Sequence, residues 1–179
     1  DQRQREIAWV RAWMEIAGRC GARCVRVIAG DAEPVANGDW RDQEAVQISA
    51  EGLRHLAGVG RQMGLRVITE NFRALGGRAG ALNAILDLCE GAVGLCVDFG
   101  NFKGPDKYDE LAALLPRATS VHAKADFREE LQMDRTDFDR CLQLARDAAF
   151  VGPYSLIFSS PGDEWEGVAK TQEVVEAWL

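Results

Sequence analysis

The sequence alternates strictly between short apolar runs and longer segments with helical periodicity, and this alternation limits the folds open to it. The apolar runs that read as strands lie near residues 24–29, 65–70, 93–98, 119–123 and 154–158. Segments with helical spacing lie near residues 3–19, 43–63, 79–89, 108–115 and 137–149, with a last one reaching the C-terminus. Strands that alternate with helices form a parallel sheet. The sequence therefore predicts an α/β fold in a single domain over residues 1–179.

Three consecutive strands end in residues that can bind a metal or move a proton. Glu70, Asp98 and His122 each come directly after an apolar run. A carboxylate at the end of a buried strand is costly unless a cation or a hydrogen-bond network receives it. Glu, Asp and His at the ends of three successive strands predict a site. The alternative is that all three are capping and ion-pairing residues.

Two architectures fit a parallel sheet, an open doubly wound sheet and a closed barrel. A doubly wound sheet often carries a glycine-rich phosphate loop after its first strand, and neither GxGxxG nor GxxxxGK[ST] occurs here. A (β/α)8 barrel gathers functional side chains from the ends of several strands, which favours the barrel. Eight βα units need about 250 residues, whereas this chain has 179 and opens with a helix. We therefore expect it to be the C-terminal two-thirds of a longer protein.

Composition excludes several classes of partner. The formal net charge is −7 and the sequence pI is about 4.9, so an acidic chain without a basic patch is not expected to bind nucleic acid. No apolar run approaches the roughly 20 residues of a membrane span, so no membrane partner is expected. The five cysteines form no CxxC pair. They predict reduced, buried thiols that serve as small core residues in a cytoplasmic protein.

Four stretches carry a resemblance to a known family. They are TENF at residues 69–72, GLCVDFGN at 94–101, SVHAK at 120–124 and PGDEWEGV at 161–168. At these positions the sequence resembles the xylose-isomerase-like TIM-barrel superfamily, within the sugar phosphate isomerase/epimerase group. The likeness runs from about Trp9 to the C-terminus. It implies a (β/α)8 TIM barrel of which about five βα units, strands four to eight, are present.

The resemblance implies a divalent metal held by Glu70, Asp98 and His122. Two carboxylates and one imidazole suit Mn²⁺, Mg²⁺ or Co²⁺, and Zn²⁺ is also compatible. The family's fourth ligand is a Glu on the eighth strand, and the matching position here is Ile157 or Ser159, neither of which is a carboxylate. The implied activity is that of a metal-dependent sugar or sugar-phosphate isomerase or epimerase, with substrate proton abstraction next to a polarised carbonyl and Glu70 as catalytic base.

Other residues are expected around this centre. Lys124 lies two residues after His122 and so points to the same side of its strand. It is expected to act in catalysis by holding a substrate oxygen or neutralising an enolate; the alternative is a rim lysine paired with an acid. The residues expected to contact substrate are Asn71, Asn101, Arg26 and Trp165. Turn formation or packing is the alternative for the asparagines and the tryptophan. Arg26 lies mid-strand and should have an acid as its partner.

The missing eighth-strand acid leaves two functions to weigh against each other. If the loop acids Asp163, Glu164 or Glu166 replace it, the chain is an enzyme acting on a small sugar-like molecule. If nothing replaces it, the chain is a non-catalytic or rewired barrel that binds a small molecule. A metal-dependent hydrolase or endonuclease is disfavoured by the acidic charge and by Asn101, where the family often has His. The sequence leaves homo-oligomer formation open.

Overall fold

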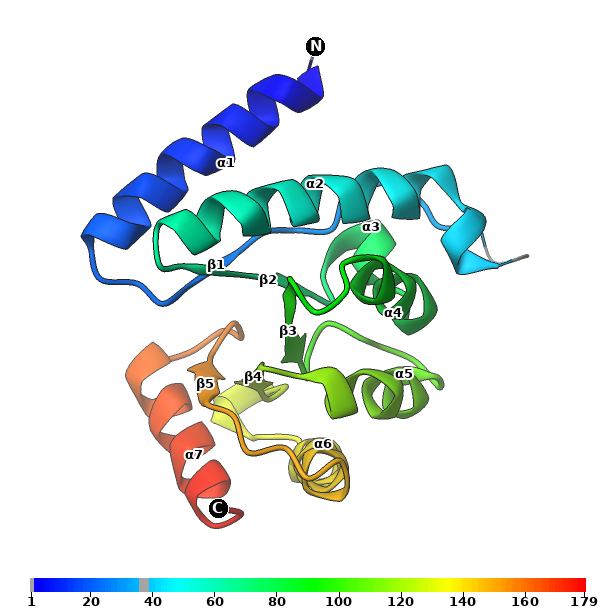
Figure 1. The fold of residues 1–179 in the computed structure, drawn as a ribbon. Helices are drawn as coiled ribbons and strands as arrows, with labels where there is room; N and C mark the ends of the chain where they lie inside the picture. Colours follow the sequence, from blue (N-terminus) through cyan, green and yellow to red (C-terminus); the bar gives the residue numbers. More distant parts are fainter. Residues whose placement is uncertain (1, 36–38) are drawn as a thin grey trace. The chain divides into compact units, whose positions relative to one another are not determined.

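The computed structural model describes residues 2–35 and 39–179, in which helices alternate with parallel strands (Figure 1). The strands are β1 (Cys24–Arg26), β2 (Arg66–Glu70), β3 (Gly94–Asp98), β4 (Ser120–Lys124) and β5 (Tyr154–Ile157). The helices are α1 (Gln2–Arg19), α2 (Glu44–Gln62), α3 (Arg73–Gly76), α4 (Ala79–Leu88), α5 (Lys107–Leu114), α6 (Arg135–Asp147) and α7 (Glu164–Glu176). Contacts divide the chain into two compact units, residues 1–95 and 96–179. That residues 1–179 form a single domain remains a prediction from the sequence.

In the first unit, β1 and β2 pair in parallel, with Arg26 opposite Ile68. Helix α2 contacts β2 and α4 and buries its apolar side. Helix α1 contacts α2 but buries only Met14 completely. Gly21, with φ of 77°, follows α1 in the left-handed conformation that ends many helices. Helices α1 and α2 and strand β2 lie where the apolar periodicity predicts them.

Strand β1 is shorter than expected. It was predicted over residues 24–29 and ends at Arg26, although the Val27 N–H still donates to the Ile68 carbonyl at 2.8 Å. Ile28, which lies within the predicted strand, is 40% exposed. In the described residues, β1 pairs with β2 alone.

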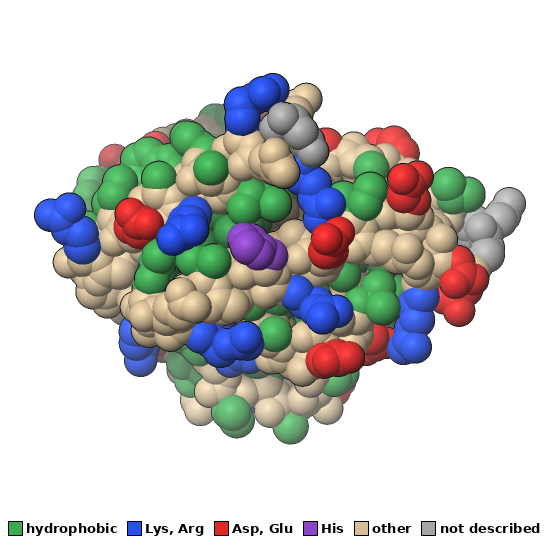
Figure 2. Space-filling model, turned by 45° about the horizontal axis from the view of Figure 1, so that its top comes forward, with side chains coloured by type: hydrophobic (Ala, Val, Ile, Leu, Met, Phe, Trp, Pro, Cys, Tyr) green, Lys and Arg blue, Asp and Glu red, His purple; other side chains and the backbone are tan. Residues whose placement is uncertain are grey.

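The first unit also exposes apolar surface on the face that carries α1 and α2 (Figure 2). Trp9, Trp13 and Ile16 of α1 are 66%, 53% and 47% exposed. A cavity of about 910 Å³ lies among α1, β1 and α2. No helix of the described residues is long and apolar enough to cross a membrane.

In the second unit, β3, β4 and β5 pair in parallel in that order. Helices α5 and α6 contact each other, and α7 contacts β5 and β4. The core includes Phe99 and Phe138, which meet edge to face with their ring centroids 6.2 Å apart. The predicted parallel pairing is confirmed for β1 with β2 and for β3, β4 and β5.

The start of α6 differs from the sequence prediction. The helical segment was expected to begin near residue 137, but α6 begins two residues earlier, at Arg135, and Asp134 is its N-cap, accepting from the Asp137 N–H at 3.1 Å. The Asp137 carboxylate instead accepts bonds of 2.7 and 2.6 Å from the buried Lys107 ammonium and one of 2.8 Å from the Tyr108 hydroxyl. Asp137 therefore joins α5 to α6. Burial, followed by this hydrogen bond, raises the pKa of Tyr108 to about 12.

The expectation that all five cysteines are buried is wrong for two of them. Cys20 and Cys24 are exposed at the turn between α1 and β1, whereas Cys89, Cys96 and Cys141 are buried. Burial raises the pKa of Cys89 to about 11 and that of Cys141 to about 12, so both remain protonated thiols at neutral pH.

We predict that Thr69→Val stabilises the protein. Thr69 is fully buried and its hydroxyl has no hydrogen-bond partner among the described residues. Valine has nearly the same shape and removes a desolvated polar group, so the free energy of unfolding should rise by about 1 kcal/mol and Tm by roughly 2–4 °C. Thr171→Val is the control, because the Thr171 hydroxyl donates to the Gly167 carbonyl at 2.9 Å. An equal gain in both variants of a thermal unfolding experiment would contradict this reading.

We predict that Asp134 stabilises α6 in a pH-dependent manner. The hydrogen bond from the Asp137 N–H holds the pKa of Asp134 below its ordinary value, with the Arg128 guanidinium also lowering it. A lowered pKa gives stability that is present above the ordinary carboxyl pKa and is lost as pH falls through the folded-state value. Asp134→Ala should therefore cost about 1 kcal/mol at pH 7, and the difference from wild type should narrow below about pH 4. Urea unfolding at several pH values tests this, with the neutral cap of Asp134→Asn as control.

Candidate functional site

The ends of β3 and β4 bring two of the predicted site residues together. The two strands are in register with Asp98 directly opposite His122, so both side chains lie on the same face. The Oδ2 atom of Asp98 is 3.4 Å from Nδ1 of His122. The Asp98 side chain is 4% exposed and that of His122 is 20% exposed, so solvent reaches the pair through the imidazole of His122.

A backbone contact fixes the orientation of the Asp98 carboxylate. The Gly100 N–H donates to Oδ1 at 2.7 Å, which turns Oδ2 toward His122. The backbone ladder continues past the strand, because the Phe99 N–H donates to the His122 carbonyl at 3.2 Å. Both residues therefore stand on paired backbone rather than on an open loop.

The separation of these two side chains fits shared coordination of one cation. Two ligand atoms each about 2.1 Å from a metal and roughly 90–110° apart are about 3.0–3.5 Å from each other. The observed 3.4 Å lies in that interval. One carboxylate and one imidazole also form a mixed oxygen and nitrogen set suited to a first-row divalent metal.

Cys96 is a neighbour of this pair that the sequence reasoning missed as a site residue. It lies two residues before Asp98 on the same face of β3, and its Sγ lies within 4.8 Å of a ring nitrogen of His122. The side chain is fully buried. The strand alternation that groups Lys124 with His122 would also have grouped Cys96 with Asp98.

Lys124 lies on the same face and crosses the backbone of the loop after β3. Its Nζ is 3.4 Å from Oδ1 of Asn101. A Cβ added at Gly100 would lie 2.8 and 2.9 Å from Cδ and Cγ of Lys124, so the side chain occupies the space that a residue other than glycine would fill. Gly100 therefore positions both Asp98 and Lys124.

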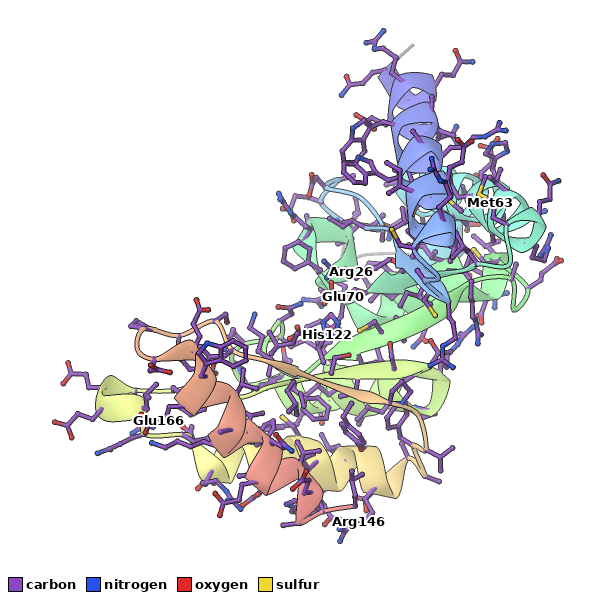
Figure 3. The ribbon with its side chains drawn as sticks, turned by 90° about the vertical axis from the view of Figure 1, so that its left-hand side faces the viewer. Arg26, Met63, Glu70, His122, Arg146 and Glu166 are labelled. Atoms are coloured by element: carbon purple, nitrogen blue, oxygen red, sulfur yellow. The ribbon has the colours of Figure 1, made fainter. Side chains whose placement is uncertain are left out.

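Ile157, one of the two positions expected to match the missing acid, also lies on this face. Ile157 of β5 is directly opposite Lys124, in the same register that puts Ser155 opposite His122. The expected loop acids have other contacts: Asp163 caps α7 by accepting from the Glu166 N–H at 2.9 Å, and Glu166, labelled in Figure 3, pairs with Lys170 at 2.9 Å. Two of the three loop acids thus stabilise α7.

In the first unit, Arg26 and Glu70 lie next to each other (Figure 3). Arg26 donates to Oε2 of Glu70 in a salt bridge, which confirms the acid partner expected for this arginine. The Glu70 side chain is 1% exposed and that of Arg26 44% exposed. Asn71 is buried directly after Glu70. Trp165, on the first turn of α7 in the second unit, is 85% exposed.

Comparison with solved structures identifies the architecture. Three that resemble the chain are a xylose isomerase-like TIM barrel protein from Mycobacterium smegmatis in complex with magnesium (18% identity, TM-score 0.69), D-allulose 3-epimerase from Methylomonas sp. (15%, 0.72) and L-ribulose 3-epimerase (13%, 0.74). The three alignments span 97–98% of this chain and 67–69% of the lengths of the matched chains. At these identities the likeness shows the fold alone.

Sequence comparison points to the same family. No curated protein matches the chain. The family model described as xylose isomerase-like TIM barrel matches residues 1–178. The parallel strands of both units and the acids at their ends fit this fold. The chain therefore belongs to the xylose isomerase-like TIM barrel family.

Proposed function

We propose that this chain forms the metal-binding part of a sugar or sugar-phosphate isomerase or epimerase. The observation that carries the proposal is the pair of Asp98 and His122, opposed on adjacent strands and 3.4 Å apart. Family membership and structural neighbours named as sugar epimerases support it. We assign the five strands as the fourth to eighth of a barrel, in keeping with a chain that matches about two-thirds of the length of its structural neighbours.

In this proposal Glu70, Asp98 and His122 would hold a divalent metal, Mn²⁺, Mg²⁺, Co²⁺ or Zn²⁺. One structural neighbour was solved with magnesium. When bound, such a metal polarises a carbonyl and binds adjacent substrate oxygens. Asp98 is ready for this role because the Gly100 N–H already orients its carboxylate.

The remaining roles fall to side chains of this chain. Glu70 takes the proton next to the carbonyl, and Arg26 holds Oε2 of Glu70 in place. Lys124 offers a positive charge to a substrate oxygen. Asn71 and Asn101 offer amides to substrate hydroxyls. The exposed ring of Trp165 offers an apolar face to a small sugar-like molecule.

A binding module without catalysis is the second candidate, and one observation favours it. Ile157 lies opposite Lys124, and we assign the family's fourth ligand position to Ile157 or to Ser159, neither of which is a carboxylate. An isomerase that moves a proton between two carbons needs a group to return it. Activity assays on ketoses and their phosphates, with purified protein and added Mn²⁺, separate the two candidates.

We predict that Asp98→Ala weakens metal binding. Removing one ligand should lower the affinity for Mn²⁺ at least about ten-fold, since even the partners that only orient ligands change affinity by 10–100-fold. Isothermal titration of Mn²⁺ into wild type and variant measures this. Asp126→Ala is the matched control, because Asp126 follows the same strand as His122 and pairs with Lys103 at 2.6 Å. Equal affinity of wild type and Asp98→Ala would show that Asp98 is not a ligand.

We predict that Ile157→Glu tightens metal binding by supplying the missing carboxylate. Lys124 lies opposite this position and will compete for the new acid. The gain should therefore be larger in Ile157→Glu combined with Lys124→Met than in the single variant. Titration of Mn²⁺ into both, with Ile157→Gln as an uncharged control of the same length, gives the comparison. Unchanged affinity in both folded variants would place the eighth-strand ligand position elsewhere.

A further inference from the structure

Lys124 differs from the other lysines of the chain in its partners. Lys103, Lys107 and Lys170 pair with Asp126, Asp137 and Glu166 at 2.6, 2.6 and 2.9 Å. Lys124 forms no ion pair among the described residues, and its polar contact is the neutral amide oxygen of Asn101 at 3.4 Å. Because the Lys124 side chain is partly buried, water solvates its ammonium group only in part and does not fully compensate for the lack of a carboxylate partner.

The structure holds this ammonium group in place. The stem of Lys124 lies across Gly100, in the space that a side chain there would occupy. Both Gly100 and Asn101 belong to the loop that follows Asp98. Lys124 is therefore positioned by the same loop that orients the Asp98 carboxylate, on the face shared with His122.

The register of β4 and β5 explains why the charge is left without a partner. Ile157 lies directly opposite Lys124. A carboxylate at position 157 would neutralise the ammonium from within the sheet, and isoleucine cannot. With isoleucine at position 157, Lys124 can therefore receive a negative charge from outside the sheet.

We propose that Lys124 binds an anionic group of the substrate, a carboxylate or a phosphate, so that the site takes acidic sugar derivatives rather than neutral sugars. This inference rests on the proposed function in assigning the bound anion to a substrate. Asp98 is the nearby acid on the same face. Its Oδ1 accepts from the Gly100 N–H and its Oδ2 lies toward His122, so its carboxylate is not paired with Lys124. A divalent metal at Asp98 and His122 would add positive charge beside Lys124 and favour an anionic substrate further.

Two-dimensional amide NMR of the chain tests the proposal with small probes. Inorganic phosphate, acetate and glycerol are titrated separately in the presence of EDTA at constant ionic strength. Phosphate, acetate or both should give saturable shifts of the Gly100 and Asn101 amides, and glycerol should not. The stronger of the two anions identifies phosphate or carboxylate as the favoured group.

Three variants show whether Lys124 is the receptor. Lys124→Met should weaken anion binding at least about five-fold, a loss of about 1 kcal/mol, while the control Lys170→Met keeps it. Gly100→Ala should weaken it by displacing the lysine stem. Ile157→Glu should weaken it by giving Lys124 an internal carboxylate. The spectra report directly whether each variant is folded.

The outcomes separate this inference from the proposed function. Unsaturable shifts with both anions, equal shifts with glycerol, or unchanged anion affinity in folded Lys124→Met would overturn the anionic substrate. Failure of wild type to bind Mn²⁺, with Lys124-dependent anion binding intact, would instead overturn the metal-dependent isomerase and leave the anion site standing.

Discussion

The register between β3 and β4 is the constraint on which the candidate site depends. Because neighbouring parallel strands keep their side chains in step, Asp98 opposite His122 puts both on one face. The next pairing adds Ile157 opposite Lys124. A slip of one residue would turn each of these side chains to the other face. The apolar residues between them, such as the fully buried Val97 and Val121, fix the register because they belong to the core.

Much of this arrangement could be predicted from the sequence, because strand periodicity and strand ends are local features. Apolar runs locate β2, β3 and β4 within a residue or two, and the terminal Asp98 and His122 follow from them. The exposure of Cys20 and the early end of β1 could not be predicted, because both depend on which surfaces other elements cover. The start of α6 was predicted two residues late because the buried apolar residues that give the helical periodicity begin at Phe138, whereas the polar cap Asp134 begins the helix.

Charge compensation distinguishes the charged side chains within each of the two units. Glu70 is almost completely buried and tolerates burial because Arg26 pairs with it. Lys107 and Asp137 compensate each other between α5 and α6. Lys124 has no carboxylate partner among the described residues and stands on the face where a ligand is expected. Among the described residues, the buried Glu70 and Lys107 are paired with opposite charges, whereas the half-buried Lys124 has no carboxylate partner and lies where function is proposed.

The two ion pairs after β3 and β4 respond differently to the solvent. Lys103 and Asp126 join the loops that follow the strands, and their side chains are 61% and 48% exposed. Lys107 of α5 and Asp137 of α6 are 6% and 17% exposed. Salt at about 0.15 M screens exposed charges over about 8 Å but reaches buried pairs much less. Rising ionic strength therefore weakens the ion pair between the loops that follow β3 and β4 more than the pair that joins α5 to α6, so salt acts on these loops before it acts on the helices.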